Sequence, residues 1–309
     1  MRSVLSMADN ILYLLNPSSD EGKARRKWQK FAKRFSTLPK KPVEVAVNSD
    51  FVKIISEYKP NIIAIAGGDG TINAVCSAVL KLERKPLLAI LPFGFGNALA
   101  YCLGVESIEK AAYVLTEKPK TITIDILKTN LPQKEIGVFN ISVGFDARIV
   151  HFRDNFRYIG LRSYALSAVR GFFFHPEKEI KFTIDHKVVL NATASSLVIA
   201  NCPIIGQNLV IAQTAKLNDG LLDCTVFSSK YAYLANLRLK GFKHPFYSEM
   251  GKVHFKAKHI RIEGEPFVQI DGDPVMSTQG LEVEILPSQL TFLRNKKENI
   301  DILYQPFIS

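Results

Sequence analysis

The sequence lacks any apolar stretch long enough to cross a membrane as a helix. A spanning helix needs roughly 18 or more predominantly apolar residues, and no run in this chain approaches that length. The first apolar run, Ile11–Leu15, stops at Asn16-Pro17 without the longer apolar region and small-residue cleavage site of a signal peptide. We therefore expect a cytoplasmic protein.

Cysteine is scarce as well, with four residues in a chain of 309. Cys76, Cys102, Cys202 and Cys224 form no CxxC pair, and the six histidines form no HExxH motif. The common zinc motifs are thereby excluded. This spacing predicts small core cysteines in a reducing compartment, and no disulfides.

Two familiar phosphate-binding motifs are also absent. The chain has no GxxxxGK[ST] loop, which excludes an ordinary phosphate-loop NTPase. It also has no GxGxxG followed by an acidic residue about 20 positions later, which disfavours a dinucleotide fingerprint.

The composition that remains is that of a globular protein with an excess of positive charge. Hydrophobic residues make up 47% and charged residues 22% of the chain, and the net charge is +11. Basic residues concentrate between Lys23 and Arg34, where Ala24, Trp28 and Phe31 fall at helical spacing. This segment predicts either an ordinary surface helix or a basic face that meets anionic lipid headgroups or phosphates. No nucleic-acid motif accompanies it, so nucleic acid is not an expected partner.

The first 120 residues alternate between strand and helix patterns, which predicts a doubly wound α/β domain of nucleotide-binding type. The expected strands are Ile11–Leu15, Val43–Val47, Ile62–Ala66 and Leu87–Leu91. The expected helices are Glu21–Phe35, Asp50–Tyr58, Ile72–Glu83 and Ser107–Glu117, with a short one near Asn97.

After about Thr121 the pattern predicts a mainly antiparallel β-sandwich domain. The expected strands are Thr121–Leu127, Gly137–Val143, Ile180–Ile184, Val188–Ala200, Leu222–Phe227, His259–Glu263, Phe267–Ile270 and Leu281–Leu286. Only Gly160–Phe174 and Tyr231–Lys240 read as helices. We expect domains at 1–122 and 123–289, and the sequence leaves open whether the tail 290–309 returns to the first domain.

A glycine-rich turn follows the third expected strand and precedes a helix, at Gly67–Thr71. Glycines there let backbone amides approach a phosphate at the positive end of the helix dipole. Asp69 adds a carboxylate that suits magnesium. Loops at Asn16–Ser19 and Pro92–Asn97 follow neighbouring strands and are expected at the same sheet edge.

Two Asp-Gly motifs lie in the β-rich half, at Asn218–Asp223 and Ile270–Pro274. The first, taken alone, is an ordinary turn. In the second, Asp271 and Asp273 would face the same side of a regular strand, where crowding raises one pKa and makes a better base. The alternative is a hairpin in which Asp271-Gly272 forms the turn between two strands.

These four segments, in this order, resemble the diacylglycerol kinase catalytic family, specifically its bacterial soluble lipid kinases. Sphingosine and ceramide kinases are more distant relatives. The resemblance implies an ATP-binding domain, a β-rich lipid-binding domain and an active cleft between them. The implied reaction is magnesium-dependent transfer of the ATP γ-phosphoryl group to a lipid hydroxyl, with diacylglycerol as the default acceptor.

The resemblance also assigns site residues. Those expected to bind the nucleotide are Asn16, Asn48, Gly67, Gly68, Asp69, Gly70, Thr71, Ile72, Asn73, Gly94, Phe95 and Asn97. The catalytic carboxylates are Asp273, Asp271 and, through magnesium, Asp69. A structural magnesium ion is implied at the Asp219 carboxylate and the carbonyls of Lys216 and Leu221. Phe145, Phe152, Phe156 and Phe172–Phe174 are either core residues or the lining of a lipid-chain cleft.

The chain departs from the family pattern at several positions. Asp273 replaces the usual glutamate, Phe95 and Ala98 replace a threonine and an aspartate, and Asp20 follows the serines of the first loop. Two other functions therefore stay open: an NAD kinase-like nucleotide kinase, and a degenerate kinase fold that only binds lipid or nucleotide. The expected partners are ATP and a lipid alcohol, and peripheral contact with the anionic inner face of the membrane is left open. The oligomeric state is open, with a homodimer among the options.

Overall fold

The computed structural model describes residues 10–38, 41–116, 119–154, 167, 170, 177–205, 209–236, 238–239 and 251–295. The chain divides into two compact units. Unit 1 consists of Met1–Ile124, Gly206–Asn208 and Ser288–Ser309, and unit 2 of Asp125–Ile205 and Leu209–Pro287. Two strands, β5 (Lys120–Thr129) and β18 (Leu281–Arg294), contribute residues to both units.

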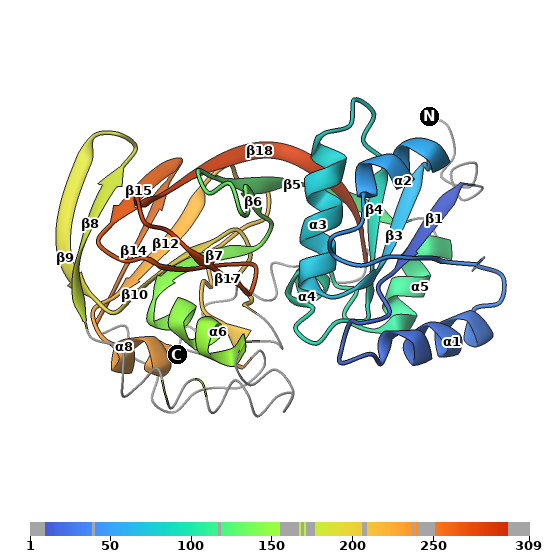
Figure 1. The fold of residues 1–309 in the computed structure, drawn as a ribbon, viewed down its shortest axis with the longest axis horizontal. Helices are drawn as coiled ribbons and strands as arrows, with labels where there is room; N and C mark the ends of the chain where they lie inside the picture. The colour runs from blue at the N-terminus through green and yellow to red at the C-terminus, as the bar shows by residue number, and fades with distance from the viewer. Residues whose placement is uncertain are drawn as a thin grey trace. The chain divides into compact units, whose positions relative to one another are not determined.

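Unit 1 is built on a parallel sheet, seen in Figure 1 as the strands β1, β3 and β4. Its strands are β1 (Ile11–Leu15), β2 (Val43–Glu44), β3 (Ile62–Gly67) and β4 (Leu87–Pro92), in the order β2-β1-β3-β4. All of these pairs are parallel, and Phe292 of β18 continues the sheet beside Leu88. The unbroken apolar runs fit strands that are covered on both faces.

Three helices connect these strands: α1 (Ala24–Arg34), α2 (Phe51–Tyr58) and α3 (Asp69–Leu80). Two more, α4 (Ala98–Cys102) and α5 (Ile108–Thr116), follow β4 and lead to β5. The crossovers through α1 and α3 run in opposite directions along the strand order. Because such crossovers are right-handed, these two helices cover opposite faces of the sheet. α2 crosses in the same direction as α3 and contacts it. The predicted doubly wound α/β architecture is confirmed.

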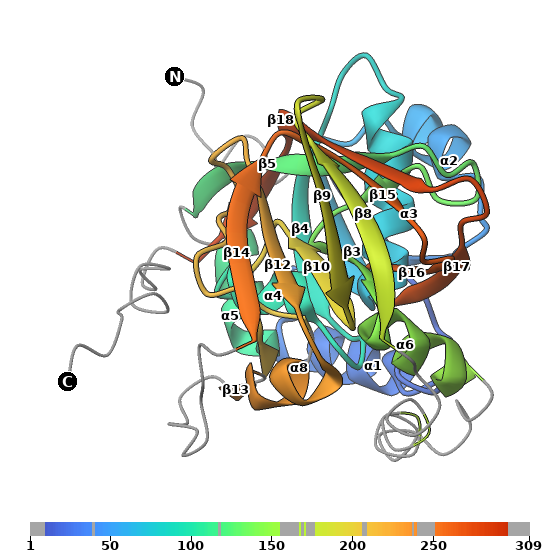
Figure 2. The same cartoon turned by 90° about the vertical axis from the view of Figure 1, so that its left-hand side faces the viewer.

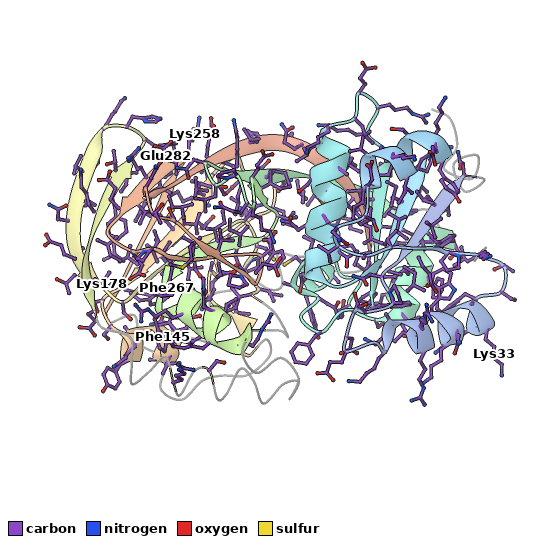
Figure 3. The ribbon with its side chains drawn as sticks, in the orientation of Figure 1. Lys33, Phe145, Lys178, Lys258, Phe267 and Glu282 are labelled. Atoms are coloured by element: carbon purple, nitrogen blue, oxygen red, sulfur yellow. The ribbon has the colours of Figure 1, made fainter. Side chains whose placement is uncertain are left out.

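The basic segment forms α1, whose apolar stripe lies in the core of unit 1. Ala24, Trp28 and Phe31 are buried, and the Phe31 ring lies 6.3 Å from that of Phe93 at the end of β4. The basic side chains lie on the other faces of the helix, and Lys33 extends away from the ribbon in Figure 3. Helical periodicity therefore identified the buried face correctly.

Unit 2 is a two-layer β-sandwich, and Figure 2 shows β14, β12 and β10 side by side in one of its sheets. One antiparallel sheet has the order β14-β12-β10-β7-β16-β17, and the other runs from β18 through β15 and β8 to β9. The strands are β6 (Ile136–Gly137), β7 (Asn140–Gly144), β8 (Lys178–Ile184), β9 (Val188–Ala194), β10 (Ser196–Ala200), β11 (Leu209–Val210), β12 (Leu222–Phe227), β13 (Arg238–Leu239), β14 (Lys252–Ala257), β15 (His259–Glu263), β16 (Phe267–Ile270) and β17 (Asp273–Met276). The predicted sandwich is confirmed.

One hydrophobic core fills the space between the two sheets. Leu197, Ile199 and Cys224 from the first sheet belong to the same buried cluster as Phe182 and Ile262 from the second. A second cluster packs helices α6 (Phe145–Asp154) and α8 (Lys230–Asn236) against the outer face of the first sheet. Phe145 belongs to that cluster and is fully buried, so it is a core residue.

Several features of unit 2 differ from the prediction. The predicted helix Tyr231–Lys240 is the shorter α8 followed by the strand β13. Val188–Ala200 is two strands, β9 and β10, which belong to different sheets, because the chain passes from one layer to the other at Ser195. Helix α6 and strand β14 were not predicted. Phe156, Phe172–Phe174 and, apart from residues 167 and 170, the predicted helix Gly160–Phe174 lie outside the described residues.

The cysteines follow the prediction only in part. Cys76 and Cys224 are free and buried. Cys102 and Cys202 are each disulfide-bonded, so the prediction that no cysteine forms a disulfide was wrong for these two. Among the helices that the structure describes, none has the length and apolarity needed to cross a membrane.

Candidate active site

The residues predicted to bind nucleotide follow four parallel strands of unit 1 and therefore share one edge of its sheet. Asn16 follows β1, Asn48 follows β2, Gly68 follows β3 and Gly94 follows β4. The strand order changes direction between β1 and β3. In open α/β sheets, ligands bind beyond the carboxyl ends of the strands at such a switch point.

The turn between β3 and α3 is closely packed, which explains its glycines. A Cβ on Gly67 would lie 2.7 Å from the Cβ of Thr71, closer than side-chain atoms approach one another. Gly68 is the N-cap of α3 with an extended backbone, and no side chain caps the helix there. The Gly68 N–H donates to Ser19 Oγ over 3.2 Å. The glycines therefore serve close packing, and a left-handed backbone is not involved.

Asn16 and Thr71 hold the first loop against α3. The Asn16 Nδ2 atom donates to Thr71 Oγ1 over 2.9 Å, and the Ser18 N–H donates to Asn16 Oδ1 over 3.1 Å. Both side chains are buried. They therefore hold the first loop in place beside the start of α3.

The loop after β4 packs backbone to backbone on the turn after β3. A Cβ on Gly94 would lie 2.3 Å from the Gly68 Cα atom, so only glycine fits. Asn97, in the left-handed region at φ 49°, accepts from the Gly94 N–H over 3.0 Å and donates to the Gly94 carbonyl over 2.8 Å. Asp69 Oδ1 accepts from the Ala98 N–H over 3.1 Å, which ties α3 to the start of α4.

The remaining residues that were predicted to bind the nucleotide differ in how far they are buried. The side chains of Ile72 and Asn73 are buried, whereas Asn48 is exposed in the turn after β2. Ile72 is thus a core residue whose N–H already donates to the Gly68 carbonyl over 3.0 Å. Phe95 is half-buried beside Gly94 in the loop after β4.

Lys27 is a residue of this edge that sequence reasoning missed. Its Nζ atom lies 3.0 Å from Asp20 Oδ2, and it donates to the carbonyls of Phe93 and Gly94 over 3.3 and 3.5 Å. Asp20, which departs from the family pattern, is therefore the partner of a lysine that reaches the loop after β4. In the sequence, Lys27 is one of many basic residues in this helix, and nothing distinguishes it from the others.

In unit 2, the Asp271–Asp273 segment forms the tight hairpin that the sequence left open as the alternative to a regular strand. Asp271 and Gly272 both have positive φ, at 53° and 82°, and form the two-residue turn between β16 and β17. An Asp-Gly pair is a common two-residue hairpin turn, because its backbone twist matches the right-handed twist of the two strands that it joins. The two carboxylates consequently do not share one face.

Asp271 points into the unit and is 3% exposed. Its carboxylate accepts from the backbone N–H groups of Val138, Phe139 and Asn140 over 2.7, 3.0 and 3.1 Å. Three such donors occupy both carboxylate oxygens and stabilise their negative charge. In this arrangement Asp271 anchors the hairpin.

Asp273 begins β17 and remains accessible. Its side chain is 41% exposed, and Oδ2 lies 2.5 Å from the Nζ atom of Lys134, whose own side chain is 12% exposed. Lys134 lies in the loop between β5 and β6, where Thr129 Oγ1 donates to the Lys134 carbonyl over 2.8 Å. An accessible carboxylate is therefore held by a largely buried ammonium, and sequence reasoning did not find this lysine.

A network of hydrogen bonds between buried polar side chains holds the hairpin in place. The Gly272 N–H donates to Gln269 Oε1 over 2.7 Å, and Gln269 Nε2 donates to Asn140 Oδ1 over 2.6 Å and to Ser142 Oγ over 2.9 Å. Ser142 and Tyr233 both donate to the carboxylate of Asp146. Burial raises the pKa of the Asp146 carboxyl, and these hydrogen bonds offset only part of the rise.

The Asn218–Asp223 segment forms a turn whose carboxylate, Asp219, already has hydrogen-bond donors from the protein. The Leu221 N–H donates to Asp219 Oδ1 over 3.2 Å, and Lys256 Nζ donates to Asp219 Oδ2 over 2.7 Å. The Gly220 N–H donates to Asp125 Oδ2 over 2.7 Å. Both Asp219 oxygens thus have protein donors, and an ammonium lies where the predicted magnesium ion would bind. As it stands, this donor set does not fit a divalent ion.

In the described part of the chain, no group of three or more His, Cys, Asp or Glu side chains is arranged to hold a metal ion. Unit 1 thus offers a sheet edge with two closely packed, glycine-dependent loops. Unit 2 offers an accessible carboxylate, Asp273, paired with Lys134.

Two family models match the chain and together cover most of it. Residues 10–129 match the diacylglycerol kinase catalytic domain, and residues 139–294 match the YegS C-terminal NAD kinase beta sandwich-like domain. The chain therefore belongs to the diacylglycerol kinase family, in the group that carries the YegS-type C-terminal domain. This confirms the resemblance inferred from its four motifs.

Individual relatives agree with this assignment. A Staphylococcus haemolyticus protein provisionally named lipid kinase SH2167 is 26% identical over 241 residues, which cover 75% of this chain and 76% of that protein. A Staphylococcus epidermidis protein with a similarly provisional lipid kinase name is 25% identical, over 77% and 78% of the two chains. Among solved structures, a provisionally named diacylglycerol kinase of Bacillus anthracis is 25% identical with a TM-score of 0.72, over 93% of this chain and 97% of that chain.

Proposed function

We propose that this protein is a magnesium-dependent lipid kinase that transfers the γ-phosphoryl group of ATP to a lipid hydroxyl, with a diacylglycerol-like alcohol as the default acceptor. In this proposal residues 1–122 with the tail 290–309 bind ATP, and residues 123–289 bind the lipid. The observation that carries the proposal is the sheet edge of unit 1, where two glycine-dependent loops pack together beside the uncapped start of α3.

ATP binding rests on the amides and the dipole of that helix start. The first N–H groups of a helix have no partner within the helix, and they favour a phosphate group. Gly68 and Gly94 bring the loops close enough for a phosphate to meet backbone rather than side chains. Asp69, held by the Ala98 N–H, offers a hard oxygen to the magnesium ion that accompanies ATP. Magnesium bound to the phosphates would neutralise their charge.

Asp273 is the proposed acceptor-side carboxylate. It would accept a hydrogen bond from the lipid hydroxyl, whose oxygen forms the new bond to the γ-phosphorus as the bond to the bridging oxygen of ADP breaks. The hydroxyl proton passes to the carboxylate. Phosphoryl transfer depends mainly on positioning and charge stabilisation, which suits a carboxylate fixed by Lys134. Asp271, already bonded to three N–H groups, would position Asp273 through the hairpin.

The direct test is transfer of labelled phosphate from ATP to lipids in mixed micelles. A panel of diacylglycerol, sphingoid bases and other lipid alcohols would identify the acceptor, and a chelator arm would test the metal requirement. Labelled lipid from at least one alcohol supports the proposal. Transfer to NAD instead would support the NAD kinase alternative, and tight binding of ATP or lipid without turnover would support the binding-module alternative.

The basic helix α1 is the proposed contact with an anionic membrane surface. Arg25 and Arg34 are paired with Glu44 and Glu109, whereas Arg26, Lys30 and Lys33 are exposed on the helix. Replacing these last three by glutamine should reduce sedimentation with anionic vesicles and leave binding to neutral vesicles unchanged. Equal sedimentation of the variant and the wild type would contradict the membrane role.

A further inference from the structure

Lys256 and Asp219 meet on the outer face of the first sheet of unit 2. Along β14, Phe255 and Ala257 face the core between the sheets, so His254 and Lys256 alternate to the outer face. Register pairs Lys256 with Asp223 and His254 with Thr225 of β12. The strand pairing therefore delivers a lysine to the Asn218–Asp223 turn, the segment at which the family resemblance implies a structural magnesium ion.

The ammonium bridges two carboxylates there. Lys256 Nζ lies 2.7 Å from Asp219 Oδ2 and 3.3 Å from Asp223 Oδ2. The Asp223 side chain is fully buried, and its other oxygen, Oδ1, accepts from Thr214 Oγ1 over 2.8 Å. Within the described residues, Asp223 Oδ2 has no hydrogen-bond partner and the Lys256 ammonium is the cation beside it, while His254 Nε2 lies 3.4 Å from the other oxygen, Oδ1. A buried carboxylate without a cation would be costly.

Hydrogen bonds between protein groups also hold the Asn218–Asp223 turn in its conformation. Asp219 Oδ1 accepts from the Leu221 N–H, and Asp125 Oδ2 accepts from the Gly220 N–H. Gly220 adopts φ 70°, which glycine alone adopts readily. A magnesium ion binds carboxylate oxygen at about 2.1 Å. At Asp219 Oδ2 it would compete for one oxygen with an ammonium 2.7 Å away, and the two cations would repel each other.

We propose that the Lys256 ammonium takes the place of a structural metal ion at this turn, so that the folding of unit 2 does not depend on magnesium. The lysine performs both tasks of such an ion: it fixes the Asp219 carboxylate and it neutralises Asp223. This inference is independent of the proposed kinase activity, because its tests measure stability and metal binding and no phosphate transfer.

Thermal unfolding of the full chain without nucleotide tests the proposal. We expect the wild-type midpoint to be the same in a chelator and in millimolar magnesium. Lys256→Met removes the ammonium and keeps most of the stem, so its midpoint should fall by about 4 °C or more in chelator. Magnesium should restore part of that loss, because a divalent ion can then bind the vacated carboxylates. Lys258→Met is the matched control, since Lys258 is an exposed lysine that directly follows the end of β14.

The wild-type measurement stands even if the methionine variant does not fold. A wild-type midpoint that falls in chelator, recovers with magnesium and loses this dependence in Asp219→Asn overturns the proposal. Calorimetric titration gives a second readout: we expect no magnesium binding that Asp219→Asn removes. A Lys256→Met variant as stable as Lys258→Met, with no response to magnesium, also contradicts the bridging role.

Discussion

The ammonium of Lys134 and the carboxylate of Asp273 lie 2.5 Å apart, although 139 positions separate them in the chain. Lys134 is largely buried and its loop is held by Thr129, while Asp273 follows a hairpin anchored by Asp271 and Gln269. Both partners are therefore held in place before any substrate binds. Preorganisation of this kind suits a reaction that depends on positioning and charge.

Replacing Asp273 by asparagine should abolish phosphate transfer. The amide cannot accept the proton of the acceptor hydroxyl, so we expect a loss of about 10²-fold or more in kcat. The measurement is labelled phosphate in the lipid product, with circular dichroism to confirm folding. Glu284→Gln, an exposed change on β18, is the control and should keep full activity. Unchanged transfer by the asparagine variant would refute the role of Asp273.

Lys134 should matter through the orientation of Asp273. Lys134→Met removes the ammonium, so we expect kcat to fall about tenfold or more while the KM for ATP stays constant. Lys134→Arg keeps the charge and should recover part of the activity. A purely structural lysine would instead lower the unfolding midpoint and leave kcat of the folded protein intact, which is the contrary result to look for.

The packed glycines of unit 1 should tolerate even a methyl group poorly. A Cβ on Gly94 would lie 2.3 Å from the Gly68 Cα atom, whereas a Cβ on Gly68 would lie 3.2 Å from Gly94 Cα. Gly94→Ala should therefore cost about 1–3 kcal/mol and weaken ATP binding. Gly68→Ala should show the same effects to a smaller extent. Denaturant unfolding and nucleotide titration measure both, and the reverse order of severity would contradict this packing argument.

The buried Asp146 should make stability depend on pH. Burial raises its pKa in the folded protein above the ordinary value of about 3.9, so the folded state holds the proton more tightly than the unfolded state. Its stabilising contribution is complete below that ordinary value and is lost as pH rises through the raised folded value. The stability advantage of wild type over Asp146→Asn should thus shrink from about pH 4 upward. A difference that is constant with pH would contradict it.

Local signals in the sequence were sufficient for the elements that depend on local patterns. The apolar runs of β1, β3 and β4 and the stripe of Trp28 and Phe31 each follow from spacing within a single segment. Errors arose where a distant partner sets the structure. At Ser195 the chain leaves one sheet for the other, because the strands that pair with β9 and β10 lie in different sheets. Strand β14 is a different case, because Lys252–Ala257 alternates polar with apolar residues, a local strand pattern that the prediction missed.

The candidate site shows the same division. The Gly67–Thr71 turn and the Asp271–Asp273 segment were recognised because their chemistry lies in consecutive residues. The sequence analysis missed three lysines, Lys27, Lys134 and Lys256. Nothing in the local sequence around a lysine indicates whether its side chain will be buried or will pair with a carboxylate. Each of the three meets a carboxylate through strand order or loop packing.

The sequence by itself determined the family, the two-domain fold class and the segments that carry chemistry, because hydrophobic period and motif spacing are local properties. Only the tertiary structure decided the surroundings of each carboxylate. Asp271 anchors a hairpin, Asp273 is accessible and paired with a lysine, and Asp219 is the partner of an ammonium. The physical reason is that the charge state and accessibility of a carboxylate depend on which donors reach it, and those donors come from distant parts of the chain.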